Sequence, residues 1–140
     1  MNFIMRFLRG FYLKQSGLER NSPNDWVAYK QIVYDKKTKL LTIKLEPNVE
    51  VFGIADTGSM DGLLDYGHNV ILTDNFDRDK LAVGDIIAYK HYTKLILHRI
   101  VGVHGDDAGR WYKTRGDNNI DDDSPVRDIQ VKYLCLGFLY

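Results

Sequence analysis

The stretch from Val83 to Val103, VGDIIAYKHYTKLILHRIVGV, contains two apolar runs that are typical of buried β-strands. The first run covers Asp85 to Tyr89 and the second covers Leu95 to Val103. Only His98 and Arg99 interrupt the apolar character of the second run. The stretch therefore predicts two strands, one of which carries a titratable side chain in apolar surroundings.

Strand-like patterns continue on both sides of this stretch. A hairpin is predicted from Gln31 to Leu45, because Leu41, Ile43 and Leu45 alternate with polar residues after a turn at 35–38. Further strands are predicted at Val49 to Ala55, Asn69 to Thr73, Trp111 to Thr114 and Val131 to Tyr140. Since no long amphipathic helical pattern occurs beyond the N-terminal segment, we expect a mainly β fold, a coiled antiparallel β domain.

The N-terminal segment has a different pattern. Its apolar residues fall on one face of a helix, with basic residues among them: Phe3, Ile4, Phe7, Leu8, Phe11 and Tyr12, interspersed with Arg6, Arg9 and Lys14. Residues 15–25 are polar and turn-rich, as in a linker. We expect residues 1–25 to form an amphipathic helix and linker ahead of a β domain at 26–140. The helix either packs on protein or makes a peripheral membrane contact, basic residues facing the headgroups.

Composition narrows the range of functions. The 140 residues suit one domain, and 19 basic residues balance 19 acidic ones, so the basic stripe of a nucleic-acid-binding protein is not expected. The chain has no apolar run of about 18 residues and no clear signal peptide. We expect a protein without a transmembrane helix, either cytoplasmic or peripheral to a membrane. The four histidines have no zinc spacing, and neither a metal nor another cofactor is expected.

The run Thr57-Gly58-Ser59-Met60 at the end of an apolar strand offers a candidate nucleophile. A serine hydroxyl is a poor nucleophile unless a base takes its proton, and the glycine beside it lets a substrate backbone approach. His98 is the side chain best suited to proton transfer near neutral pH. Each feature alone is common: Gly-Ser occurs in turns, and a strand histidine often belongs to a core.

A polar cluster follows the Trp111 strand: Gly116-Asp117-Asn118-Asn119, and then three further aspartates at 121–123. Such a cluster is usually a solvated turn, but Asp117 could orient a histidine as the third member of a triad does. The alternating Asp117, Asn119 and Asp121 also suit a calcium loop, although Asp122 stands where such a loop needs glycine.

Taken together, these motifs resemble the type I signal peptidase superfamily, in particular its archaeal and endoplasmic-reticulum branch. The matching elements are Ser59-Met60, the Gly84-Asp85 strand, His98-Arg99, and Gly116-Asp117-Asn118-Asn119 with a further aspartate soon after. The resemblance covers about Val49 to Tyr140. It implies a coiled β domain, which agrees with the fold expected from the strand patterns.

The resemblance implies a serine endopeptidase. Ser59 would attack the scissile carbonyl, and His98 would take the proton and return it to the leaving amine. The two supporting aspartates of the family match Asp117 and Asp123, with Asp122 as an alternative to Asp123. The partner would be a peptide or protein substrate, bound in extended form and cut after small residues.

The resemblance also implies an oxyanion site. The backbone N–H of Ser59 would donate to the developing oxyanion, and Thr57 stands where relatives often carry a second hydroxyl donor. Three features depart from the family. The proline that usually follows Ser-Met is missing, Gly67-His68 stands in place of a later Gly-Asp, and only the N-terminal segment stands where relatives carry a membrane anchor.

Two other functions remain open. Self-cleaving SOS repressors and mutagenesis proteins belong to the same superfamily, and the segment around Ser16-Gly17 would then be the arm that Ser59 cuts. Those proteins use a lysine base, however, and the nearest lysine to His98 is Lys94. The second alternative is a non-catalytic binding protein on the same scaffold. The sequence indicates no oligomeric state.

Overall fold

The computed structural model describes residues 23–45 and 48–140, and within these residues the chain is mainly β. The N-terminal helix predicted at the start of the chain lies outside the described residues. The strands are β1 (Ile32–Asp35), β2 (Leu40–Ile43), β3 (Val49–Gly53), β4 (Asn69–Thr73), β5 (Ile86–His91), β6 (Lys94–Asp106), β7 (Gly109–Arg115), β8 (Val126–Arg127) and β9 (Val131–Leu139). Three short 3-10 helices join them: η1 (Tyr29–Gln31), η2 (Arg78–Lys80) and η3 (Asp128–Gln130).

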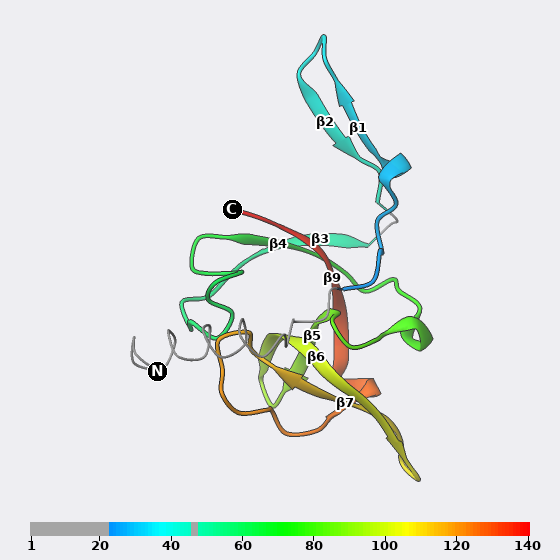
Figure 1. The fold of residues 1–140 in the computed structure, drawn as a ribbon, viewed down its shortest axis with the longest axis vertical. Coiled ribbons are helices and arrows are strands. Elements are labelled where there is room, and N and C mark those ends of the chain that lie inside the picture. Colours follow the sequence, from blue (N-terminus) through cyan, green and yellow to red (C-terminus); the bar gives the residue numbers. More distant parts are fainter. Residues whose placement is uncertain (1–22, 46–47) are drawn as a thin grey trace, which may run out of the picture.

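Seven of these strands form one antiparallel sheet in the order β3-β4-β9-β5-β6-β7-β8, while β1 and β2 pair only with each other in the sheet topology (Figure 1). The expected antiparallel β architecture is confirmed, and the strands begin and end within a few residues of their predicted positions. The C-terminal strand β9 lies between β4 and β5, so it joins an early hairpin to a later one.

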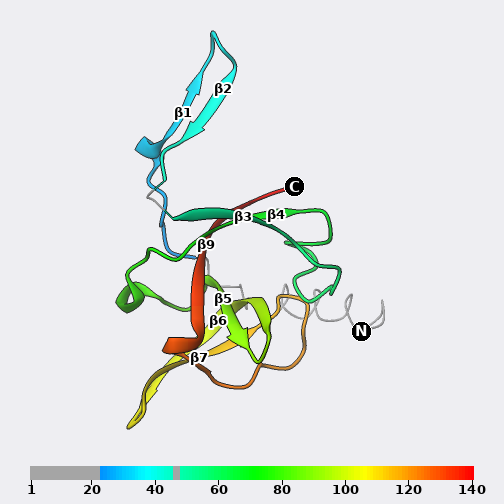
Figure 2. The same ribbon diagram turned by 180° about the vertical axis from the view of Figure 1, so that it is seen from behind.

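The sheet curls strongly (Figure 2). Residues 52–53 of β3, the first strand in the order, and residues 94–98 of β6, the fifth, line the same cavity. The register shifts within the β4–β9, β5–β9 and β6–β7 pairs. Such bulges bend a strand and increase its twist, which accounts for the curl.

The core consists of two clusters on opposite faces of β5. Ile87 and Tyr89 belong to one cluster, and Ile86 and Ala88 belong to the other. Since successive strand residues point to opposite faces, burial of all four shows that β5 is covered on both sides. Burial on both faces explains why the sequence of this strand is a continuous run of apolar residues.

A buried carboxylate anchors the first described residues to the sheet. Asp85 is fully buried and accepts hydrogen bonds from the backbone and side-chain nitrogens of Asn24, at 2.7 and 2.8 Å, and from Trp26 Nε1 at 2.9 Å. The N–H of Ala82 also donates to Asp85. The Gly84-Asp85 turn therefore has a structural role that its sequence pattern did not indicate.

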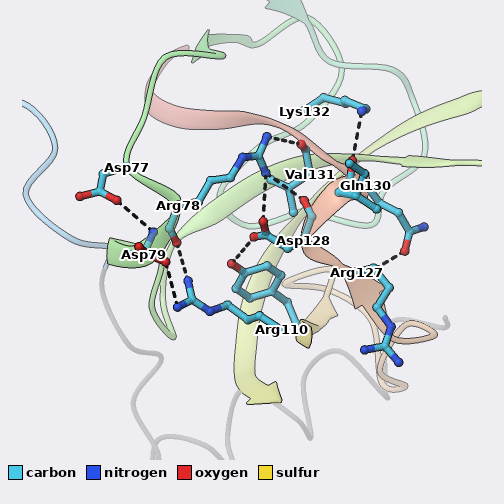
Figure 3. A network of polar contacts seen from close by, with 11 residues as sticks. Asp77, Arg78, Asp79, Arg110, Arg127, Asp128, Gln130, Val131 and Lys132 are labelled. Atoms are coloured by element: carbon cyan, nitrogen blue, oxygen red, sulfur yellow. Dashed lines mark hydrogen bonds and ion pairs between the residues drawn. The ribbon is translucent and has the colours of Figure 1, made fainter. Parts of the chain in front are cut away.

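A second polar network holds η2 and η3 together (Figure 3). Arg78 donates to the carbonyl oxygens of Asp128 and Val131, at 2.9 and 3.0 Å. Arg110 of β7 donates to the Arg78 carbonyl and pairs with Asp79. Because these guanidinium groups are engaged with carbonyls and carboxylates of the chain itself, the network stabilises the fold rather than forming a free anion site.

The β1–β2 hairpin projects away from the curled sheet (Figures 1 and 2). Its open end is tied by Gln31, whose side chain donates to the Lys44 carbonyl at 2.7 Å and accepts from the Ala28 N–H at 2.8 Å.

The helices were also compared with what a membrane span requires. None of those in residues 23–45 and 48–140 has the length and the apolar character of a transmembrane helix.

Candidate active site

The candidate nucleophile lies in a tight turn after β3. Gly58 has a φ of +66°, a conformation that favours glycine, and it places Ser59 at the mouth of a cavity. The next residue, Met60, is 4% exposed and belongs to the second core cluster. The turn is therefore anchored by a buried side chain directly beside the serine hydroxyl.

His98 reaches this hydroxyl from the part of β6 just before the pairing with β7 begins. It lies on β6, is 6% exposed, and its Nε2 is 3.1 Å from Ser59 Oγ. Its Nδ1 is 2.6 Å from Asp123 Oδ2. When Nδ1 carries the proton and donates it to Asp123, the lone pair of Nε2 faces the Ser59 hydroxyl, as a general base requires.

Asp123 is held by donors other than the histidine. The same oxygen, Oδ2, accepts hydrogen bonds from Thr114 Oγ1 at 2.7 Å and from Tyr89 OH at 3.0 Å. Burial raises the pKa of Asp123, but the bonds from His98, Thr114 and Tyr89 and the charge of His98 outweigh burial, so the pKa is lowered overall. The carboxylate is therefore ionised at neutral pH and can fix the orientation of the imidazole.

Sequence reasoning missed Tyr89 and Thr114. Both are buried strand residues, with exposed fractions of 1% and 0%, and nothing in an apolar strand pattern distinguishes them from ordinary core positions. Burial strongly raises the pKa of Tyr89; the Thr114 hydrogen bond opposes this effect, and Asp123 adds to it. The phenol thus stays protonated and remains a donor to Asp123.

Asp117 occupies a different place from the one expected of a triad member. Its two carboxylate oxygens accept hydrogen bonds from Arg99 Nε and Nη2, at 2.9 and 2.8 Å. Arg99 also donates to the Gly84 carbonyl at 2.8 Å. The structure therefore brings Asp123 to the imidazole and Asp117 to the neighbouring guanidinium, in a buried bidentate pair that supports local structure.

The Gly116-Asp117-Asn118-Asn119 run is also hydrogen-bonded to the turn that carries Ser59. The Asn118 N–H donates to the Ser59 carbonyl at 2.9 Å, and its side chain donates to the Gly58 carbonyl at 2.8 Å. A Cβ on Gly116 would lie 2.5 Å from the Ser59 carbonyl oxygen. The glycine is thus needed for close approach of two backbone segments, which fixes the position of the candidate nucleophile.

We expect Gly116→Ala to displace the serine turn. The added methyl group would meet the Ser59 carbonyl at 2.5 Å and the Asn119 side chain at 2.8 Å, so the backbone must shift. Overpacking of this kind costs about 1–3 kcal/mol in the free energy of unfolding, measurable by urea denaturation. Gly105→Ala is the matched control, because a Cβ there meets nothing within 4 Å. Equal stability of the two variants would show that the contact with Ser59 is unimportant.

Thr57 lies beside the candidate nucleophile, as the oxyanion prediction requires. Its hydroxyl oxygen is 3.4 Å from Ser59 Oγ, and Thr57 is exposed at the cavity. The backbone N–H of Ser59 and this hydroxyl are the two candidate oxyanion donors, and their use as such remains a prediction.

The cavity beside Ser59 and His98 has a volume of about 500 Å³. Two elements supply most of its walls: β3 with the residues after it, and the first half of β6. The lining residues on these elements include Phe52, Gly53, Ile54, Ala55, Leu95, Ile96 and Leu97. The walls are predominantly apolar, so the cavity suits uncharged side chains of a bound chain.

The remaining acidic residues do not assemble a metal site. Asp122, the alternative to Asp123, pairs with Lys113 and Arg115 at 3.5 and 3.3 Å. In the calcium-loop interpretation Asp117 would be the first ligand, but its oxygens are bonded to Arg99. Among residues 23–45 and 48–140, no group of three or more histidine, cysteine or acidic side chains could hold a metal ion.

The structure thus places a hydroxyl, an imidazole and a carboxylate in a hydrogen-bonded series. Serine hydrolases of several unrelated folds use this arrangement. Among curated proteins, signal peptidase I W of Bacillus subtilis (strain 168) is 32% identical to this chain over 84 residues. The match covers 59% of this chain and 44% of the relative, so the chain corresponds to less than half of that protein. No family model and no solved structure matches the chain. The partial match supports a relationship to the signal peptidase family and a peptidase-like function.

Proposed function

We propose that this chain is a serine endopeptidase of the signal peptidase type, with Ser59 as nucleophile, His98 as general base and Asp123 as the group that orients the base. One observation carries the proposal: the contacts from Ser59 Oγ to His98 Nε2, at 3.1 Å, and from His98 Nδ1 to Asp123 Oδ2, at 2.6 Å. The relationship to a signal peptidase supports it independently.

In the proposed reaction, Ser59 Oγ attacks the carbonyl carbon of the scissile peptide bond while His98 Nε2 takes the hydroxyl proton. The oxyanion receives hydrogen bonds from the Ser59 N–H and the Thr57 hydroxyl, each worth about 3 kcal/mol in the transition state. The imidazolium then gives its proton to the leaving amine, which departs and leaves an acyl-enzyme. Water, deprotonated by His98, hydrolyses this ester and restores the serine. Asp123 stabilises the imidazolium in both steps.

The sheet supports binding of an extended peptide. β3 is the first strand in the order and pairs only with β4, so its other edge is unpaired in the sheet. The pairing of β6 with β7 begins at Arg99, which leaves residues 94–98 unpaired on that side. Both edges line the cavity, and a peptide strand between them would gain main-chain hydrogen bonds and bring its scissile bond to Ser59. Small residues beside the cut are what the resemblance implies.

The test is intact-mass spectrometry of the wild type and of Ser59→Ala, each incubated alone and with a peptide that carries a signal-peptidase cleavage site. We expect the wild type to cut the peptide and Ser59→Ala to leave it whole. A shortened wild-type chain, with Ser59→Ala intact, would instead assign self-cleavage to the same residues. If the folded wild type cuts neither, with and without added lipid vesicles, the proposal is wrong and a binding function on this scaffold takes its place.

A further inference from the structure

The β1–β2 hairpin carries apolar side chains that the rest of the described chain does not cover. Leu40 and Leu41 are each 62% exposed, and Tyr34 is 54% exposed. A two-stranded hairpin alone is marginally stable in water, and exposed apolar patches usually mark an interaction site. We therefore expect the projecting hairpin to bind a partner that buries these side chains.

One face of the hairpin is apolar throughout, whereas Leu40 lies on the opposite face, where its partner in the register is Asp35. In the β1–β2 register Ile32 pairs with Ile43, and Tyr34 pairs with Leu41. Directly opposed residues point to the same face, and residues two apart on a strand do so as well. All four therefore form one continuous apolar face, to which no polar residue of either strand contributes.

The charge around this apolar face is predominantly positive. Residues 30–44 contain five lysines, all exposed, against the single acidic residue Asp35: Lys30, Lys36, Lys37, Lys39 and Lys44. Since the whole chain has equal numbers of basic and acidic residues, the hairpin concentrates positive charge that the rest of the chain balances. The lysines lie at the turn and at the open end, on both sides of the apolar face.

We propose that the β1–β2 hairpin docks on a lipid bilayer that contains anionic lipids. Its apolar face of Ile32, Tyr34, Leu41 and Ile43 would enter the boundary between headgroups and acyl chains. The lysine side chains would extend their stems along the apolar surface and place their ammonium groups among the anionic headgroups. Such a bilayer has an anionic layer above an apolar interior, so it matches the lysines and the apolar face together.

The connection to β3 gives this docking a consequence for the cavity. β2 ends at Ile43 and β3 begins at Val49, so the intervening chain can span at most about 20 Å. Phe52 and Gly53 of β3 line the cavity. A hairpin bound to a bilayer therefore holds the cavity within a few nanometres of that surface. The inference concerns binding only and holds whether or not Ser59 is a nucleophile.

The experiment is co-sedimentation of the full chain with vesicles, in a Ser59→Ala background so that no cleavage alters the result. We expect binding to mixed phosphatidylglycerol–phosphatidylcholine vesicles, weaker binding at high salt, and little binding to pure phosphatidylcholine. Lys37→Gln should weaken the binding about fivefold, and neutralising Lys36, Lys37 and Lys39 together should weaken it about a hundredfold. Tyr34→Ser with Leu41→Ser should weaken it at least tenfold.

Matched controls separate the hairpin from the rest of the chain. Lys90→Gln and Ile129→Ser change an exposed lysine and a 79% exposed isoleucine elsewhere, and both should bind as the parent does. Circular dichroism checks that every variant is folded. The proposal is overturned if the parent chain fails to bind anionic vesicles, or if the hairpin variants bind as well as the controls. Loss of self-association in the hairpin variants, without vesicle binding by the parent, would assign the face to a second copy of the chain.

Discussion

Replacement of His98 by alanine should lower kcat/KM for peptide cleavage at least about 10⁴-fold while the protein remains folded. The imidazole Nε2 lies 3.1 Å from Ser59 Oγ, within hydrogen-bond distance, and can accept its proton. Without a base the serine hydroxyl stays protonated, and the attack on the carbonyl loses its driving force. The measurement is the steady-state rate of cleavage of the same peptide that is used in the mass-spectrometry test.

Two companion variants make this result specific. Ser59→Ala should lose as much activity as His98→Ala, because the two residues act as one unit. Asp123→Asn should lose less, about 10²- to 10⁴-fold, since it misorients the imidazole but leaves a base in place. Near-wild-type turnover by folded His98→Ala would refute the base assignment. A wild-type rate for Asp123→Asn would reduce Asp123 to a structural residue.

The second large effect concerns stability. Asp117→Ala should lower the free energy of unfolding by about 3–5 kcal/mol, because it leaves the buried guanidinium of Arg99 without its bidentate partner. The side chains of Arg99 and Asp117 are 10% and 3% exposed, so water cannot replace the lost contacts. For a chain of this size the change corresponds to a fall in the melting temperature of about 10–17 °C, measurable by calorimetry.

Asp122→Ala is the control for this prediction. Asp122 lies in the same loop region, but it pairs with Lys113 and Arg115 where all three side chains are 35–43% exposed. Exposed pairs contribute at most about 1 kcal/mol, so this variant should melt within a few degrees of the wild type. Similar melting temperatures for Asp117→Ala and Asp122→Ala would show that the Arg99–Asp117 pair does not hold the site together.

The strands were predictable because the burial of a strand determines the pattern of apolar residues in its own sequence. Apolar runs and alternating patterns located β3, β4, β5, β6 and β9, since each strand presents one or both faces to the core. A coiled domain was expected from the strand patterns and from the resemblance, but the detailed course of the curl was not. It depends on register shifts between strands distant in sequence, such as that at Ile71/Leu72, which no local pattern encodes.

The sequence predicted Ser59 and His98 of the candidate site but not which carboxylate contacts the imidazole. Ser59 and His98 were paired from motif order, and the structure brings them within hydrogen-bond distance. The sequence did not show that Asp123 contacts His98 and that Asp117 contacts Arg99. Which carboxylate reaches the imidazole depends on the path of the loop after β7. Arg99 takes Asp117 because it follows His98 on β6 and so points to the opposite face of the strand.

The position of β9 has a consequence for the order in which the molecule can be assembled on the ribosome. Ser59 follows β3, which pairs with β4, whereas His98 lies on β6, which pairs with β5; β9 pairs with both β4 and β5. Residues 131–139 are translated after all of the residues around Ser59, His98 and Asp123. Until they leave the exit tunnel, no strand pairs with both β4 and β5. The sheet can therefore close around Ser59 and His98 only after residues 131–139 have emerged, so the strand that joins the two halves is the last of the described strands to be translated.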